Sequence, residues 1–383
     1  MRHVVIIGVG IHPFGRFPGT EFTELGRVAV FGALGDAGIS WKHVQAAFCG
    51  TVACGTAAGH RVLAQIGLTG IPVVNVENAC ASSGSALRLA AQSVAAGVYD
   101  VALAFGVEKM PPGFMAMTSY DRWQAFHGLA VNPVSFALAA RWHMATYGTT
   151  ELQLAKVSEK NHRNGVLNPN AMYHKALSIG EILNSPMVCD PLRLLMLCAP
   201  NEGAAAVIVT TSKIARRFTA RPIHLAAAAL GSPPYGTRFG MLAAGSVCGS
   251  TSGLGPEVTE LTARKAFEEA DLGPKELACV ELQDTDACSE IIHMEQLGLC
   301  APGEGGRLLE EGLTEITGRI PVNPSGGLLA KGEPAGASSL GQVHELVLQL
   351  RGEAGPRQVE GAQVALAHTV GAGGNCAVII LKR

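Results

Sequence analysis

The stretch IPVVNVENACASSGSAL, residues 71–87, runs from an apolar segment through Cys80 into a series of small residues. Its first six residues predict a short buried strand, and the Pro-free residues after Cys80 predict a helix that continues to about Gly97. Cys80 is therefore expected where a strand passes into a helix. At a helix N-terminus, unpaired backbone N–H groups and the helix dipole favour the thiolate, which is the reactive form of cysteine.

A buried, unreactive thiol is the competing interpretation of Cys80. Free cysteine is among the most buried residue types and usually packs as a small apolar side chain. The chain holds ten cysteines, so most of them are expected to be structural. They show no Cys-x-x-Cys pair and no zinc-ligand spacing, which predicts free thiols, no metal site and a reducing, cytoplasmic location.

The composition indicates a large buried interior. Of the 383 residues, 48% are hydrophobic and 16% are charged, against about 25% charged in typical soluble domains. This length predicts two or three compact units, and the low charge also predicts a subunit interface. A formal net charge of −2 gives no broad electrostatic case for nucleic acid. No apolar run reaches the length of a membrane span, so no membrane association is expected.

Strand and helix patterns alternate along the chain, with Gly-rich turns between them. This pattern predicts an α/β architecture whose sheets are covered by helices. Two short segments also recur in the same order: Ala81–Ser83 at Ala337–Ser339, and Val101–Ala104 at Val364–Ala367. Because the two offsets are nearly equal, we infer two related α/β halves.

The segment between the two halves differs in composition. We expect one half at 1–110 with about 192–220, an insertion at 111–191, and a second half at 221–383. The insertion holds two of the three Trp and five of the ten Met residues. Because methionine adapts to varied shapes, such a segment suits a cover over an apolar ligand. Packing of a helical subdomain is the simpler interpretation and explains most of these residues.

Two glycine-rich segments mark the second half. Asn323–Pro334 leads into a predicted helix from Ala337 to about Leu350, and it lacks the Gly-Lys-Ser/Thr arrangement of a phosphate loop. His368–Gly374 is a predicted strand end followed by glycines. Such glycines allow tight turns and close backbone approach to a ligand, although an ordinary turn between two strands explains them equally well.

Taken together, these segments resemble the thiolase family, in the branch related to the sterol carrier protein thiolases. The resemblance implies two α/β halves in a five-layered α-β-α-β-α arrangement, an inserted loop domain and a homodimer. It also implies acyl-CoA and coenzyme A as substrates, no permanently bound cofactor, and an acyl group carried on Cys80. The matching motifs cover essentially the whole chain: Asn78–Cys80 with Gly84, Gly106–Met110, Asn201–Ala206, Val280–Cys300, Asn323–Gly336 and His368–Gly374.

Two positions depart from this branch. Glu333 stands where the branch usually has the histidine of Gly-His-Pro, which activates the cysteine and donates to the thioester oxyanion. An ionised glutamate would repel an oxyanion, but burial can raise its pKa so that it acts as a general base. Gln283 replaces a second histidine and can donate a hydrogen bond but cannot transfer protons. His368 is a weaker acid–base candidate, in a loop where many thiolases use a second cysteine.

The expected function is a thiolase-like acyltransferase that cleaves or forms a C–C bond of a 3-oxoacyl-CoA through acyl-Cys80. Glu333 is the expected base, and acetyl-CoA or propionyl-CoA is one product. A thiolase-like retro-aldolase acting on a 3-hydroxyacyl-CoA, with a small OB-fold partner subunit, is one alternative. A catalytically degenerate protein that only binds acyl-CoA or a partner is the other. The small residues 81–84 keep the pocket open and favour an active enzyme, whereas the acyl chain stays undetermined.

Overall fold

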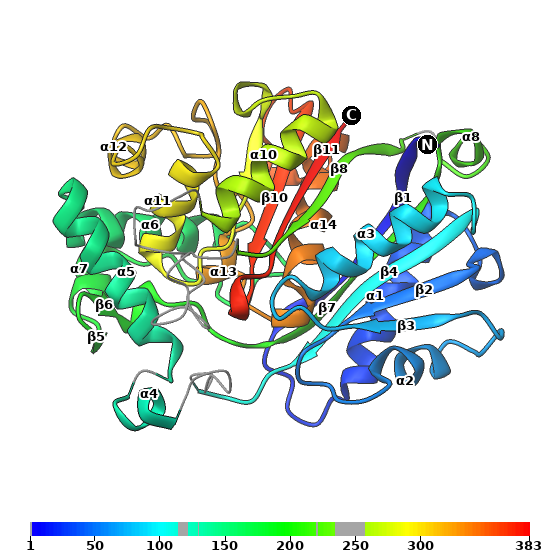
Figure 1. Cartoon of the computed structure of the whole chain (residues 1–383), viewed down its shortest axis with the longest axis horizontal. Coiled ribbons are helices and arrows are strands. Elements are labelled where there is room, and N and C mark those ends of the chain that lie inside the picture. The colour runs from blue at the N-terminus through cyan, green and yellow to red at the C-terminus, as the bar shows by residue number, and fades with distance from the viewer. Residues whose placement is uncertain (1, 114–121, 129, 220, 234–256) are drawn as a thin grey trace.

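The computed structural model describes residues 2–113, 122–128, 130–219, 221–233 and 257–383, and Figure 1 shows its arrangement. Nine strands form one large sheet in the order β3-β2-β4-β7-β1-β8-β11-β10-β9, and β5 and β6 form a separate hairpin. The strands up to β7 make one half of the large sheet, and β8 to β11 make the other half. The α/β architecture expected from the sequence is confirmed.

The first half alternates strands and helices along the chain. All ten residues of its strand β7 are buried, as expected for a strand that helices cover on both faces. Helix α1 packs on β1 and β7, and α3 packs on β2 and β4. The elements are β1 (Val4–Gly15), α1 (Phe22–Ala37), β2 (Ala46–Gly50), α2 (Ala58–Ala64), β3 (Val73–Val76), α3 (Ser82–Ala95), β4 (Val101–Lys109), β7 (Glu202–Thr211) and α8 (Ser212–Ala215).

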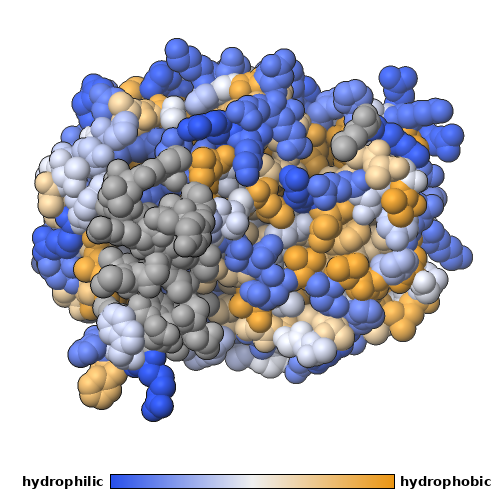
Figure 2. Space-filling view, in the orientation of Figure 1, coloured by the Kyte–Doolittle hydropathy of each residue, from blue (hydrophilic) through white to orange (hydrophobic). Residues whose placement is uncertain are grey.

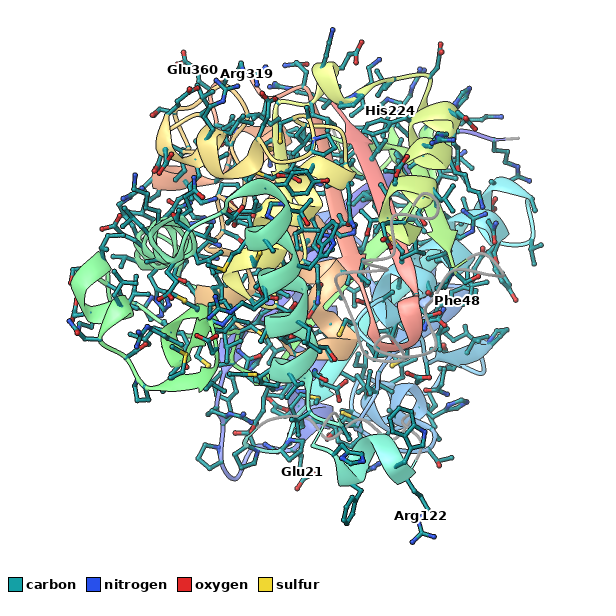
Figure 3. All side chains as sticks on the ribbon, turned by 60° about the vertical axis from the view of Figure 1, so that its left-hand side comes forward. Glu21, Phe48, Arg122, His224, Arg319 and Glu360 are labelled. Carbon is teal, nitrogen blue, oxygen red and sulfur yellow. The ribbon has the colours of Figure 1, made fainter. Side chains whose placement is uncertain are left out.

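The segment between β4 and β7 consists of short and medium helices and the small hairpin. Figure 1 shows α5, α6 and α7 together on one side of the molecule, near α11 and α12, and Figure 3 shows Arg122 of α4 projecting outward. Met115 and Met117, which the sequence places in this segment, lie outside the described residues. The elements are α4 (Arg122–Phe126), α5 (Asn132–Tyr147), α6 (Glu151–Val166), α7 (Ile179–Leu183), β5 (Met187–Cys189) and β6 (Leu192–Arg193).

The second half repeats the strand–helix pattern of the first. The helix predicted from Ala337 is α14, and the predicted final strands are β10 and β11, which pair antiparallel. The elements are β8 (Ile223–Gly231), α10 (Val258–Ala270), β9 (Cys279–Glu281), α11 (Ala287–Gln296), α12 (Gly305–Glu310), α13 (Gly327–Ala330), α14 (Ser338–Arg351), β10 (Val364–Val370) and β11 (Cys376–Lys382).

Helices α3 and α14 lie between the two halves of the sheet. Helix α14 packs on β10 and β7, and it also contacts α3. On the outer faces, α1 covers the first half and α10 packs on β8 and β11. The halves are joined between β1 and β8 by the antiparallel pairs Val5–His224 and Ile6–Ile223. The internal sequence repeat corresponds to equivalent helices, because its two copies, Ala81–Ser83 and Ala337–Ser339, lie at the starts of α3 and α14.

The position of strand β3 differs from the one predicted from the sequence. The sequence predicts a buried strand, but β3 lies at the edge of the sheet and Val74 is 43% exposed. Within the described residues β3 pairs with β2 on one side, so its other edge stays open. An apolar run by itself does not distinguish a central strand from an edge strand that another chain covers.

The described residues contain no helix that is both long enough and apolar enough to span a membrane. The cysteines within the described ranges are free thiols. No group of three or more His, Cys, Asp or Glu side chains in the described part of the chain is arranged to hold a metal ion.

Candidate active site

Cys80 lies in the connection between β3 and α3, two residues before α3 begins at Ser82. Its carbonyl oxygen accepts a hydrogen bond from Ser339 Oγ of α14 at 3.3 Å. On the other side, the loop after β10 approaches so closely that a Cβ on Gly371 would lie 2.8 Å from the Cys80 nitrogen. The glycine loop predicted to permit close approach therefore packs on the backbone of Cys80.

Glu333 is positioned by two paired backbone segments. The Glu333 N–H donates to the Ala199 carbonyl at 3.2 Å, and the Asn201 N–H donates to the Glu333 carbonyl at 3.2 Å. Gly332 has a φ of +102°, and a Cβ there would collide with the Asn201 amide. Only glycine fits this position, for its backbone conformation as well as for space. The Glu333 residue that follows is 6% exposed.

Three side chains meet around the Glu333 carboxyl group, and together with Glu333 we call them the Glu333 cluster: Cys80, Cys198 and Gln283. Gln283 Nε2 donates to Glu333 Oε1 at 2.7 Å. Cys198 Sγ donates to Glu333 Oε2 at 2.9 Å. The Cys80 thiol lies near the same carboxyl group, whose charge contributes to its raised pKa after burial. The structure thus brings together Cys80, Gln283 and Glu333, three of the four residues selected from the sequence.

Burial decides the protonation of this cluster. It raises the pKa of Glu333 above its ordinary value, against the hydrogen bonds from Cys198 and Gln283. Burial, followed by the charge of Glu333, raises the pKa of Cys80 well above its ordinary value. A position at a helix start would by itself lower the pKa of Cys80. A buried site and a full negative charge outweigh the partial charge of a helix that begins two residues later.

Gln283 is fully buried and is held next to the start of α13. Its Oε1 has no hydrogen-bond partner among the described residues. The adjacent Asp284 accepts hydrogen bonds from the N–H groups of Leu328 at 2.7 Å and Leu329 at 3.2 Å. Asp284 thereby fixes α13, which leads directly into the Glu333 segment.

His368 lies outside the Glu333 cluster. Its Nε2 is 3.0 Å from Thr259 Oγ1 of α10, and its ring is 4.6 Å from that of His293. Thr369, the next residue of β10, instead contacts Ser339 of α14 at 3.0 Å. Because side chains alternate along a strand, His368 faces the sheet surface opposite to the one that contacts the Cys80 segment. Burial and His293 lower the pKa of His368 well below its ordinary value.

Cys198 is the member of the cluster that sequence reasoning missed. Its N–H donates to the Thr285 carbonyl at 2.9 Å, which ties it to the Gln283 segment. Its remaining surface lines a cavity of about 470 Å³. The sequence signal is slight: a cysteine three positions before Asn201, where a matched motif begins. The apolar lining of the cavity includes Met172, Tyr173, Leu177, Leu194, Leu195 and Leu329.

Glu108 holds the segment that follows Glu333 in place through hydrogen bonds to backbone N–H groups. Its buried carboxyl group accepts the N–H groups of Val52 at 2.8 Å, Ala53 at 2.9 Å and Gly336 at 3.0 Å. Gly336 leaves no space for a Cβ, which would lie 2.8 Å from Glu108 Oε2. Burial raises the pKa of Glu108, and the backbone donors oppose this shift. We assign Glu108 a positioning role for the Glu333 segment.

Comparison with known proteins identifies the family to which this chain belongs. Residues 4–213 match the thiolase N-terminal domain, and residues 247–383 match the thiolase C-terminal domain-like family. The chain is 40% identical to the acetyl-CoA acetyltransferase of Methanothermobacter thermautotrophicus, with 100% of both chains covered. It is 35% identical to sterol carrier protein 2 of Bos taurus, over 100% of this chain and 72% of that protein.

A solved structure extends the likeness to three dimensions. The Ltp2-ChsH2(DUF35) aldolase superposes with a TM-score of 0.85 and 24% sequence identity, over 99% of this chain and 98% of that chain. At this identity the superposition establishes a shared fold. Together with the two domain matches and the two relatives, it shows that the chain belongs to the thiolase superfamily, in its sterol carrier protein type branch.

Proposed function

We propose that this chain is an acyl-CoA acyltransferase that carries the acyl group on Cys80 and cleaves or forms a C–C bond of a 3-oxoacyl-CoA. The observation that carries the proposal is the meeting of Cys80, Gln283 and the buried Glu333 carboxyl group. The likeness to an acetyl-CoA acetyltransferase supports it. Coenzyme A and its thioesters are the substrates, and the proposed reaction calls for no permanently bound cofactor or metal.

In the thiolytic direction, Glu333 takes the Cys80 proton as the sulfur attacks the C3 carbonyl carbon. A carboxylate whose pKa is raised by burial suits this role, because a base works best when its pKa is near the working pH. The C2–C3 bond then breaks and leaves an acyl thioester on Cys80. Coenzyme A releases the shortened acyl-CoA, so that one hard step becomes two easier ones. Gln283 donates to Glu333 and orients its carboxyl group.

The test is the acyl-enzyme itself. After incubation with acetyl-CoA, mass spectrometry of peptides is expected to find the acetyl group on Cys80. The Cys80→Ala variant is expected to lose both the adduct and thiolysis. Cys279→Ala, which removes a buried thiol from strand β9, is the matched control and is expected to keep both. An unmodified Cys80 in active-site titrations would exclude covalent catalysis.

Retro-aldol cleavage of a 3-hydroxyacyl-CoA, with a small OB-fold partner subunit, is the second candidate. The fold likeness to the Ltp2-ChsH2(DUF35) aldolase and the raised pKa of Cys80 favour it over other reactions on this scaffold. Cys80→Ala separates the two candidates, because a retro-aldolase keeps its activity without the thiol. A protein that only binds acyl-CoA would be stabilised thermally by CoA esters but form no adduct and give no turnover.

We also propose that the insertion at 111–191 covers the substrate and that the chain forms a homodimer. Met172, Tyr173 and Leu177 of the insertion line the cavity that Cys198 borders. An apolar acyl group placed there would lie beside the Glu333 cluster. The division into two halves, 1–110 with about 192–220 and 221–383, remains part of this proposal.

A further inference from the structure

One carboxyl group joins two thiols from distant parts of the chain. Cys198 Sγ donates to Glu333 Oε2 at 2.9 Å, and Cys80 lies near the same carboxyl group. Cys80 is 7% exposed, whereas Cys198 is more open and borders the apolar cavity of about 470 Å³. A substrate in that cavity would therefore meet Cys198 directly.

The proposed reaction needs a proton donor besides Glu333. When the C2–C3 bond breaks, C2 becomes a carbanion and must take a proton, while Glu333 holds the proton of Cys80. Gln283 is an amide and cannot transfer protons. His368 contacts Thr259 on the opposite surface of β10. Cys198 has a proton, contacts Glu333 and faces the cavity.

We propose that Cys198 is the second acid–base group of this site. Its thiol protonates C2 of the leaving fragment, and the resulting thiolate then takes the proton of the incoming coenzyme A thiol. The proposal rests on the thiolase-type function proposed above. It assigns to Cys198, in the segment before β7, the proton transfers that the buried His368 is not placed to make.

The protons and electron pairs balance over the cycle. First, Cys80 gives its proton to Glu333 and its sulfur bonds to C3, while the C2–C3 electron pair moves to C2 and takes the Cys198 proton. Then the coenzyme A thiol gives its proton to Cys198, and its sulfur displaces Cys80 from the acyl carbon. Glu333 finally returns the proton to Cys80. The net reaction converts a 3-oxoacyl-CoA and coenzyme A into two acyl-CoA molecules.

The shared carboxyl group favours this order of events. In the resting site, burial and then the Glu333 charge raise the pKa of Cys198 well above its ordinary value, so the thiol keeps its proton. Once Glu333 has accepted the Cys80 proton, its negative charge is lost. The pKa of Cys198 then falls, and the thiol becomes a stronger acid when the carbanion forms.

The test separates acylation from proton transfer to carbon. We would compare Cys198→Ala and Cys198→Ser with the wild type for three readouts: the Cys80 adduct, thiolysis, and deuterium exchange at C2 of acetyl-CoA in D₂O. Both variants are expected to keep the adduct but to lose about 10²-fold or more in thiolysis and exchange. Serine keeps a hydrogen-bond donor for Glu333, but an alcohol is a far weaker acid than a thiol. Cys279→Ala is the control for loss of a buried thiol.

Each other outcome has a definite meaning. Thiolysis by Cys198→Ser within about tenfold of the wild type would show that Cys198 only orients Glu333, and the proposal would be wrong. Loss of the Cys80 adduct in a folded Cys198→Ala protein would likewise overturn it, because coenzyme A can leave as a thiolate without the Cys198 proton, whereas the carbanion at C2 needs a proton. A wild-type protein without a Cys80 adduct overturns the proposed function, and this proposal with it.

Discussion

Among single residues, Glu333 has two opposite effects on Cys80. Its charge raises the thiol pKa, yet as a base it accepts the thiol proton during attack. We predict that Glu333→Gln speeds alkylation of Cys80 by iodoacetamide at a fixed, mildly alkaline pH, because the thiolate fraction rises when the charge is removed. Acyl transfer is expected to slow by about 10²–10⁴-fold. Mass spectrometry of the Cys80 peptide and the turnover rate measure the two effects.

The control is Glu360→Gln, which removes a carboxylate from the periphery of the molecule, where Figure 3 labels Glu360. Neither alkylation nor turnover is expected to change. Slower alkylation of Cys80 in Glu333→Gln would mean that the carboxylate stabilises the thiolate. The base mechanism would then need another proton acceptor.

The sequence identified most of the Glu333 cluster but not its protonation. Cys80, Gln283 and Glu333 lie in motifs that match a family, and their contacts follow from the shared fold. Cys198 was missed because its role depends on a contact with Glu333, 135 residues further along the chain. Cys80 was expected as a thiolate because a local pattern reveals the helix but not the burial or the distant carboxylate.

At the scale of elements, the turn that carries Glu333 depends on Gly332. We predict that Gly332→Ala reduces Cys80 acylation strongly, since a Cβ would collide with Asn201 and displace the turn, and that it lowers stability by about 1–3 kcal/mol. The matched control is Gly352→Ala, which also has a positive φ, +78°, but has open space around it. Thermal unfolding and adduct formation measure the two effects. Equal loss of acylation in both variants would contradict this role of Gly332.

His344 on helix α14 makes the stability of the folded protein depend on pH in the acid range. Burial, helped by Lys331 and Arg357, lowers the pKa of His344 from 6.5 to about 4. Between these values the unfolded chain binds the proton and the folded chain does not. Stability therefore falls as the pH drops from 6.5 towards 4, by up to about 3 kcal/mol from this residue.

We predict that His344→Gln flattens this part of the pH dependence. The measurement is the free energy of unfolding in denaturant titrations at neutral pH and near pH 4, for the wild type and the variant. The exposed His43 provides the control, since His43→Gln is expected to keep the wild-type slope. An unchanged slope in His344→Gln would assign the acid sensitivity to other buried groups.

For the whole molecule, local sequence patterns predicted the helices and strands better than the place of each element in the sheet and the residues that pack on it. The repeated segments Ala81–Ser83 and Ala337–Ser339 both mark the start of a helix, α3 and α14, because each of these helices begins with the same small residues. The surface on which His368 lies was not predictable, because alternation along β10 has two registers and only the packing of α10 and α14 selects one. Similarly, an apolar run could not show that β3 lies at an edge.

The open edge of β3 favours a homodimer. Its residue Val74 is 43% exposed, and Leu89 of the neighbouring α3 is 36% exposed. Figure 2 shows apolar residues gathered over α3 and the strands beside it. An apolar edge strand without Pro or Lys can pair with another chain, and pairing about a two-fold axis would cover this edge in both subunits.

We therefore predict that the wild-type chain sediments with twice the 39.7 kDa mass of one chain and that Val74→Lys sediments as a monomer. In a dimer, the introduced ammonium groups would repel each other or lose their hydration at the pairing edge. In the monomer they stay hydrated, so the substitution favours the monomer. Val166→Lys on α6 changes a residue with the same 43% exposure at a site away from β3, and it is expected to stay dimeric. A wild-type mass of one chain across the concentrations of an ultracentrifugation series would contradict the dimer. If the wild type is dimeric and Val74→Lys remains so, the subunits associate through a different surface.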